Sequence, residues 1–165
     1  TVRDTTKSGV KFTKVLRDRG IHCGIKVDTG LVPIGGTDDE TLTQGLAGLG
    51  ARCAEYYKLG CRFAKWRAVL KIGKNLPSKA AIEENAKALA RYGSICQANG
   101  LVPIIEPEIL QDGDHSIDVC AQVSEKVFSC VMRELFSQHL LIEGLLLKPN
   151  MVTPGIGCKQ RATSK

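Results

Sequence analysis

Aromatic residues, cysteine pairs and long apolar runs are scarce in this sequence. Phe, Trp and Tyr make up 5% of its 165 residues, and its 23 basic residues are scattered along the chain. Nucleic-acid-binding surfaces combine clustered basic residues with aromatic ones, so we expect no nucleic-acid partner. A net charge of +6 is equally compatible with an anionic substrate.

No apolar run is long enough for a membrane span. The longest, residues 140–147, is interrupted by Glu143, whereas a transmembrane helix needs roughly 20 apolar residues. No signal peptide opens the sequence. We therefore expect no membrane partner.

The seven cysteines include no Cys-x-x-Cys pair, and their number is odd. Disulfide frameworks use an even number of cysteines, and structural zinc sites use closely spaced pairs. We expect neither a disulfide framework nor a bound metal. Free cysteines are typical of a reducing compartment, and we expect the protein to be cytoplasmic.

Short β-like segments alternate with helical patterns along the chain. The expected strands are residues 24–28, 63–70, 101–105 and 142–147, and the expected helices are residues 41–58, 79–97 and 116–138. The last helix repeats apolar residues at three- and four-residue intervals, among them Val123, Val127 and Val131. Alternating strands and helices predict a parallel sheet.

Charged residues recur at nearly constant spacing within or just after these strands. Lys26, Lys65, Glu106 and Lys148 are separated by 39, 41 and 42 residues, which indicates a βα repeat. Eight such units form a (β/α)8 TIM barrel of roughly 250 residues. The expected fold is therefore α/β, of the TIM barrel family, with about four central βα units present. We expect residues 1–165 to form a single domain that is a fragment of a longer chain, because half a barrel leaves strand edges unpaired.

These four charged residues suggest two alternatives. Side chains at the carboxyl ends of parallel barrel strands converge on one mouth, and an amine beside other cations loses its proton more readily and can then attack a ketone. Glu106 would transfer protons, while Lys26 and Arg67 would hold phosphate or hydroxyl groups. The alternative is an internal ion-pair network at the barrel mouth, and the spacing alone does not distinguish the two.

Several short sequence motifs resemble a known family, and this resemblance favours the catalytic alternative. In order, they are GIKVD (24–28), TQGL (43–46), FAKWR (63–67), ENA (84–86), LARY (89–92), VPIIEPEIL (102–110), DGDH (112–115) and LLKPNMVTPG (146–155). Together they closely resemble class I fructose-bisphosphate aldolase, the metal-independent glycolytic enzyme. The resemblance extends over residues 20–155.

The resemblance implies a role for each charged residue. Lys148 would form the Schiff base with the substrate ketone, with Glu106 as its acid/base. Lys65 and Glu108 would be the further catalytic residues, and the substrate-binding residues would be Lys26, Arg67 and Asp28. Lys26 would lie near the phosphate of the aldehyde half.

The family's wider properties are also implied. The enzyme would cleave fructose 1,6-bisphosphate reversibly to dihydroxyacetone phosphate and glyceraldehyde 3-phosphate without a cofactor. The full-length protein would be a homotetramer, and binding to actin or cytoskeletal adaptors is an alternative main role. Retention of the charged set favours the enzyme, although the fragment alone is expected to be inactive.

Overall fold

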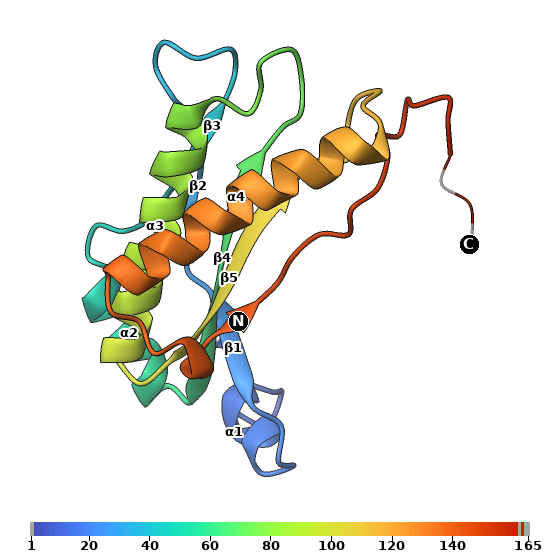
Figure 1. Cartoon of the computed structure of the whole chain (residues 1–165). Helices are drawn as coiled ribbons and strands as arrows, with labels where there is room; N and C mark the ends of the chain where they lie inside the picture. The colour runs from blue at the N-terminus through green and yellow to red at the C-terminus, as the bar shows by residue number, and fades with distance from the viewer. Residues whose placement is uncertain (1, 162, 164–165) are drawn as a thin grey trace.

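The structure is a computed structural model that describes residues 2–161 and 163. Its main sheet has four parallel strands in the order β1-β4-β5-β6 (Figure 1). Their bounds are β1 Cys23–Lys26, β4 Cys61–Leu70, β5 Val102–Ile109 and β6 Leu146–Leu147. A separate antiparallel hairpin pairs β2 (Gly30–Pro33) with β3 (Thr41–Gln44). The predicted parallel sheet is therefore confirmed.

Helices connect the parallel strands. Their bounds are α1 Phe12–Arg17, α2 Leu49–Lys58, α3 Lys79–Ala98 and α4 Ile117–Ser137, with a short 3-10 helix η1 at Ile142–Gly144. The long helices α3 and α4 pack together on one side of β4 and β5 (Figure 1). Ser78 and Ser116 cap these helices by accepting hydrogen bonds from Ala81 N and Val119 N, the usual arrangement at a helix N-terminus. In the described part of the chain, no helix combines the length and apolarity that crossing a bilayer requires.

Three of the predicted elements were wrong in part, and one of them is the strand expected over residues 101–105, because β5 continues to Ile109. The helix expected over residues 41–58 begins only at Leu49, because Thr41–Gln44 is strand β3. Gly45 and Gly48 have φ values of 125° and 65°. A right-handed helix requires negative φ at each residue, so no helix can continue through these two glycines. The strand expected over residues 142–147 is a 3-10 turn followed by a two-residue strand. The helices expected over 79–97 and 116–138 agree with α3 and α4 to within one residue at each end.

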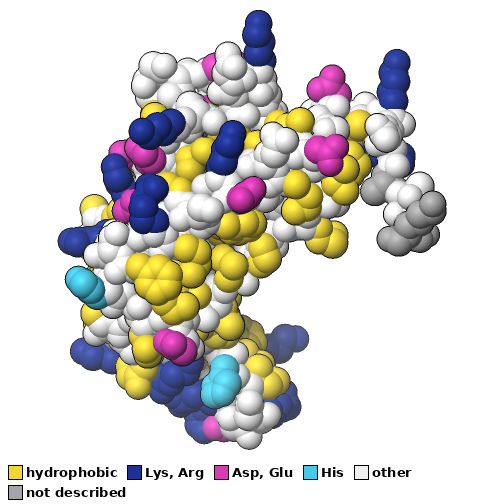
Figure 2. All heavy atoms as spheres, in the orientation of Figure 1, with side chains coloured by type: hydrophobic (Ala, Val, Ile, Leu, Met, Phe, Trp, Pro, Cys, Tyr) yellow, Lys and Arg dark blue, Asp and Glu magenta, His cyan; other side chains and the backbone are white. Residues whose placement is uncertain are grey.

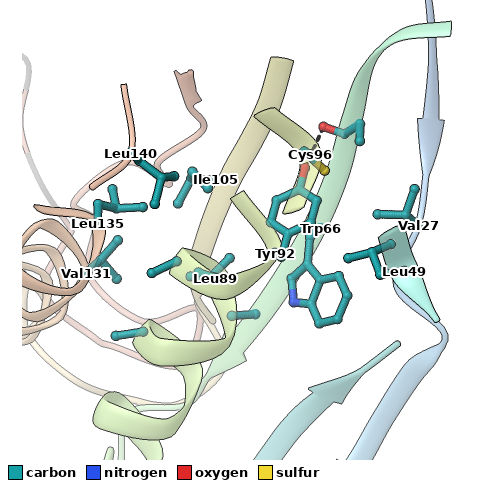
Figure 3. Packing of buried hydrophobic residues seen from close by; sticks show 14 of the residues in the cluster. Val27, Leu49, Trp66, Leu89, Tyr92, Cys96, Ile105, Val131, Leu135 and Leu140 are labelled. Atoms are coloured by element: carbon teal, nitrogen blue, oxygen red, sulfur yellow. Dashed lines mark hydrogen bonds between the residues drawn. The ribbon is translucent and has the colours of Figure 1, made fainter. Parts of the chain in front are cut away.

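The core lies between the sheet and its helices. Side chains alternate along β4, so that Ala64, Trp66 and Ala68 are fully buried on the side that faces α3. Trp66 stacks on Tyr92 of α3, with ring centroids 5.3 Å apart (Figure 3). Burial of two such large aromatic rings stabilises the helix–sheet contact.

The hydroxyl of Tyr92 also joins two strands. It donates to Ala64 O at 2.7 Å on β4 and accepts from Ile104 N at 3.2 Å on β5. The side chain therefore satisfies backbone groups of both strands from the helix side. This contact fixes β4 and β5 beside Lys65, the next residue of β4.

Candidate active site

The charged residues of β4 and β5 lie on the face of the sheet opposite α3. Lys65 and Arg67 alternate with the buried residues of β4, and Glu106 and Glu108 do the same on β5. Because successive side chains of a strand point to opposite faces, these four residues share one face. The register pairs Arg67 with Glu106 across the two strands.

Glu106 lies between two lysines. Glu106 is only 3% exposed, and its Oε1 accepts a hydrogen bond from Lys148 Nζ at 2.5 Å. Its Oε2 forms an ion pair with Lys65 Nζ at 2.7 Å, without the angle of a hydrogen bond. The Lys148 side chain is 61% exposed and the Lys65 side chain 28%. A buried carboxylate thus holds two amines, one of them open to solvent.

Lys148 reaches this position from the segment that follows β6. Its backbone N donates to Ile105 O at 2.8 Å, which extends the pairing of β6 with β5 by one residue. Two residues later, Asn150 Oδ1 accepts from Ile109 N at 3.0 Å. The chain on both sides of the Lys148 side chain is therefore attached to β5.

Arg67 and Glu108 form a second pair. Arg67 Nε donates to Glu108 Oε2, and this hydrogen bond is the main cause that holds the pKa of Glu108 below its ordinary value. The same bond raises the pKa of Arg67. Lys148 and Lys65 contribute further to the lowered pKa of Glu108 through their charges, so the two pairs belong to one electrostatic cluster.

Lys26 and Asp28 form a third pair at the end of β1. Lys26 Nζ contacts Asp28 Oδ1, and the Asp28 side chain is buried while that of Lys26 is 56% exposed. Lys26 is in register with Lys65 of β4. The charge of Asp28 helps to raise the pKa of Arg67. The seven candidate residues therefore lie on neighbouring strands of the sheet, within β1, β4 and β5 or directly after β1 and β6.

The nearest large cavity lies mostly outside the charged cluster. A cavity of 690 Å³ beside β1 has Lys26 at its edge, but it is lined mainly by α1 and β1, among them Phe12, Leu16 and Ile25. It includes none of the other six candidate residues. Within residues 2–161 and 163, no group of three or more His, Cys, Asp or Glu side chains could hold a metal ion.

Comparison with known proteins identifies the family. The model of the glycolytic fructose-bisphosphate aldolase class-I family matches residues 1–165. The chain belongs to the class I fructose-bisphosphate aldolases. This assignment confirms the family that the strings from GIKVD to LLKPNMVTPG indicated.

Relatives from distant organisms support this class I aldolase assignment. The chain is 60% identical over 159 residues to fructose-bisphosphate aldolase of Dictyostelium discoideum, covering 95% of this chain and 44% of the relative. It is 58% identical over 156 residues to human fructose-bisphosphate aldolase C, covering 94% and 43%. The chain therefore spans less than half the length of the curated relatives it matches.

A solved aldolase structure confirms the fold class. The chain is similar to fructose-bisphosphate aldolase from Plasmodium falciparum, whose structure was determined in complex with TRAP and a small-molecule inhibitor. The TM-score is 0.96 at 55% identity, over 98% of this chain and 47% of that one. The four parallel strands and the helices between them are thus part of an aldolase TIM barrel, as their repeat predicted.

Several contacts that support the candidate site had no clear sign in the sequence. Thr43 Oγ1 donates to Arg67 O at 2.6 Å, which joins β3 of the hairpin to β4 beneath the Arg67–Glu108 pair. Asn150 Oδ1 accepts from Ile109 N, which attaches the segment after Lys148 to β5. Thr43 belongs to TQGL and Asn150 to LLKPNMVTPG, so the strings contained these residues but did not reveal their partners.

Proposed function

We propose that the complete protein containing this chain cleaves fructose 1,6-bisphosphate reversibly to dihydroxyacetone phosphate and glyceraldehyde 3-phosphate. The observation that carries the proposal is the contact of the buried Glu106 carboxylate with both Lys148 and Lys65. Membership of the class I aldolase family supports the same reaction. An ion-pair network at the barrel mouth and a catalytic site are not exclusive, because these ion pairs bring a nucleophile and a proton carrier together.

The first step is attack of the neutral Lys148 amine on the substrate ketone. The new C–N bond gives a carbinolamine, and loss of its hydroxyl as water gives a protonated imine. Glu106, 2.5 Å from Lys148 Nζ, is within the distance at which a general base accepts a proton. The same carboxyl can return that proton to the departing hydroxyl.

The second step breaks the bond between carbons three and four. A base removes the proton of the carbon-four hydroxyl, the aldehyde half leaves, and the bonding electrons move to the imine nitrogen, forming an enamine. Covalent catalysis of this kind replaces a metal as electron sink. Protonation of the enamine at carbon three and hydrolysis then release dihydroxyacetone phosphate and free Lys148. We assign Lys65, which pairs with Glu106 at 2.7 Å, and Glu108 to further proton transfers.

Cationic side chains would bind the anionic parts of the substrate. Arg67 is oriented by Glu108, and Lys26 by Asp28. A guanidinium or ammonium held in place by a carboxylate loses less side-chain freedom when it binds a phosphate or hydroxyl. We assign Lys26 to the phosphate of the aldehyde half and Arg67 to the region beside the imine.

We further propose that the complete protein is a cytoplasmic homotetramer. One relative from Arabidopsis thaliana is named a cytosolic aldolase, which supports the compartment. A role in binding actin or cytoskeletal adaptors is a second candidate, and the structure of the Plasmodium falciparum relative with TRAP supports protein binding within the family. Sedimentation of the complete protein tests the tetramer.

A cleavage assay tests the reaction. The complete protein is expected to cleave fructose 1,6-bisphosphate in the presence of EDTA, because the proposed electron sink is an imine. Lys148→Met should abolish activity, whereas Lys126→Met on the outer helix α4 should leave it unchanged. Full activity of K148M, or complete loss of wild-type activity with EDTA, would contradict the proposal.

A further inference from the structure

The backbone at the end of β1 is held from several directions at Val27. Its side chain is buried in the core, and its N–H donates to Lys65 O at 3.0 Å. Its carbonyl accepts a hydrogen bond from Arg52 Nη1 at 2.8 Å. Val27 lies between Lys26 and Asp28, so these contacts fix the backbone from which both charged side chains project.

Arg52, on α2, connects this backbone to a second segment. Its other amino group, Nη2, donates to Gly45 O in the loop between β3 and α2. One guanidinium therefore bridges two backbone carbonyls that belong to segments 18 residues apart in sequence. The planar fork of arginine, with donors in fixed directions, suits such a bridge better than the single ammonium of lysine.

The two bridged segments are in close contact. A Cβ atom added at Gly45 would lie 3.1 Å from Thr29 N and 3.2 Å from Asp28 Cα. Thr29 N also donates to Gln44 O at 2.9 Å. The Gly45 loop therefore packs directly on residues 27–29, and the Arg52 bridge closes this contact from the helix side.

We propose that Arg52 is a positioning residue for Lys26. Without its bridge, the backbone after Lys26 keeps the hydrogen bond to β4 but loses the attachment of its carbonyl to α2. The Lys26–Asp28 pair would then be placed less accurately relative to Lys65. This inference rests on the proposed function, because it assigns Lys26 to the phosphate of the aldehyde half.

Two substrates separate this role from a general loss of structure. Fructose 1-phosphate lacks the phosphate assigned to Lys26, whereas fructose 1,6-bisphosphate carries it. In the complete protein, Arg52→Gln is expected to lower kcat/KM for the bisphosphate roughly 10-fold to 100-fold, mainly through KM, since small displacements of binding groups have effects of this size. The kcat/KM for fructose 1-phosphate should change less than about threefold.

Arg62→Gln is the matched control. Arg62 also donates to two backbone carbonyls, Tyr57 O at 3.2 Å and Cys61 O at 2.7 Å. It is the second residue of β4 and does not contact the backbone beside Lys26. R62Q should affect both substrates equally and weakly. Arg52→Lys, which keeps the charge and can reach one carbonyl, should recover part of the bisphosphate activity.

A double-mutant cycle with Lys26→Ala tests whether Arg52 acts through Lys26. If it does, R52Q should add little further loss in the K26A background. Equal losses on both substrates, full additivity with K26A, or no loss in R52Q would overturn the proposal. If neither R52Q nor R52K folds, as judged by thermal unfolding, Arg52 is a folding residue and the proposal is wrong.

The same variants separate failure of the proposed cleavage reaction from failure of the role of Arg52. A wild-type protein that cleaves neither substrate contradicts the proposed function and this proposal with it. An active wild type in which K26A has no preference between the two substrates contradicts the assignment of Lys26 to the phosphate. An active wild type with a selective K26A defect and a fully active R52Q overturns the role of Arg52 alone.

Discussion

Burying a charged carboxylate is costly unless other charges compensate for it. Glu106 is compensated twice, by Lys148 at Oε1 and by Lys65 at Oε2. Removal of either amine would leave the carboxylate only partly compensated in a buried position. At the scale of single residues, the same contacts that stabilise Glu106 also bring the proposed nucleophile and proton carrier within transfer distance.

Replacing Glu106 tests the proton-transfer role. Glu106→Gln keeps the size of the side chain but cannot accept a proton, so kcat for fructose 1,6-bisphosphate is expected to fall roughly 100-fold to 10,000-fold. Single-turnover kinetics should assign the loss to imine formation. Glu84→Gln, at an exposed pair with Lys87, is the control and should retain wild-type kcat. An E106Q protein within a few-fold of wild type would show that another group transfers the proton.

The Arg67–Glu108 pair predicts a pH dependence of stability. Because Arg67 lowers the native-state pKa of Glu108, the pair stabilises the fold fully above the ordinary carboxyl pKa of about 4.3. This contribution is lost as the pH falls through the lowered native-state pKa. The pKa of Arg67 is raised, so its contribution is fully present below the ordinary pKa of a guanidinium and adds no change in the acid range.

Thermal unfolding of wild type and Glu108→Gln measures this effect. The Tm difference is expected to be constant from roughly pH 5 to pH 8 and to shrink below about pH 4. E84Q should differ little from wild type at any pH, since exposed ion pairs contribute little. A Tm difference between wild type and E108Q that persists undiminished at the lowest pH would contradict the stabilising role of the pair.

The sequence predicted the charged residues of the site better than the contacts that support them. Lys65, Glu106 and Lys148 follow from a spacing close to 40 residues, because one βα unit of this length separates neighbouring parallel strands. Arg52 and Thr43 act on backbone carbonyls. Every residue has a carbonyl, so side-chain patterns contain no information about such a partner.

At the scale of elements, the error at β3 has a physical cause. Leu42, Leu46, Leu49 and Cys53 follow one another at intervals of four, three and four residues, which is the pattern of an amphipathic helix. The pattern continues across the strand–helix boundary, so periodicity alone could not reveal it. The glycines at 45 and 48, with positive φ, mark that boundary.

These two glycines provide a matched test of the loop. Gly45→Ala is expected to lower the free energy of unfolding by about 1–3 kcal/mol, because φ is 125° and the new Cβ would lie 3.1 Å from Thr29 N. Gly48→Ala should cost about 1–2 kcal/mol, because its φ is 65° but nothing lies within 4 Å. Denaturant unfolding measures both values. A G45A protein more stable than G48A would mean that the loop does not pack on residues 27–29 as described.

At the scale of the whole molecule, one face of the four-stranded parallel sheet is covered by helices and the charged face is left open. Large apolar side chains are exposed in the chain, including Phe136 at 60%, Leu141 at 63% and Leu146 at 54%. Figure 2 shows hydrophobic side chains gathered near the C-terminal end of α4. Since large apolar patches mark contact surfaces, we expect further protein to cover them in the complete aldolase.

The order of the parallel strands, β1-β4-β5-β6, could be predicted because each repeat adds one neighbour to the sheet. The hairpin of β2 and β3 lies outside this repeat, and nothing in the spacing indicated it. Helices α3 and α4 were predicted to within one residue at each end because helical patterns alternate with the strands, and in α4 apolar residues repeat at three- and four-residue intervals. The sequence therefore predicts the repeated strands and helices, but not the hairpin inserted between β1 and α2.

The central claim is that Lys148 forms the imine, and borohydride trapping tests it most directly. Borohydride reduces the imine between the complete protein and dihydroxyacetone phosphate to a stable secondary amine, which peptide mapping by mass spectrometry locates. A single label on Lys148 that is absent without borohydride is expected, with Lys26 and Lys65 unlabelled as internal controls. A label on either of those two lysines, or no label on an active protein, would contradict the account.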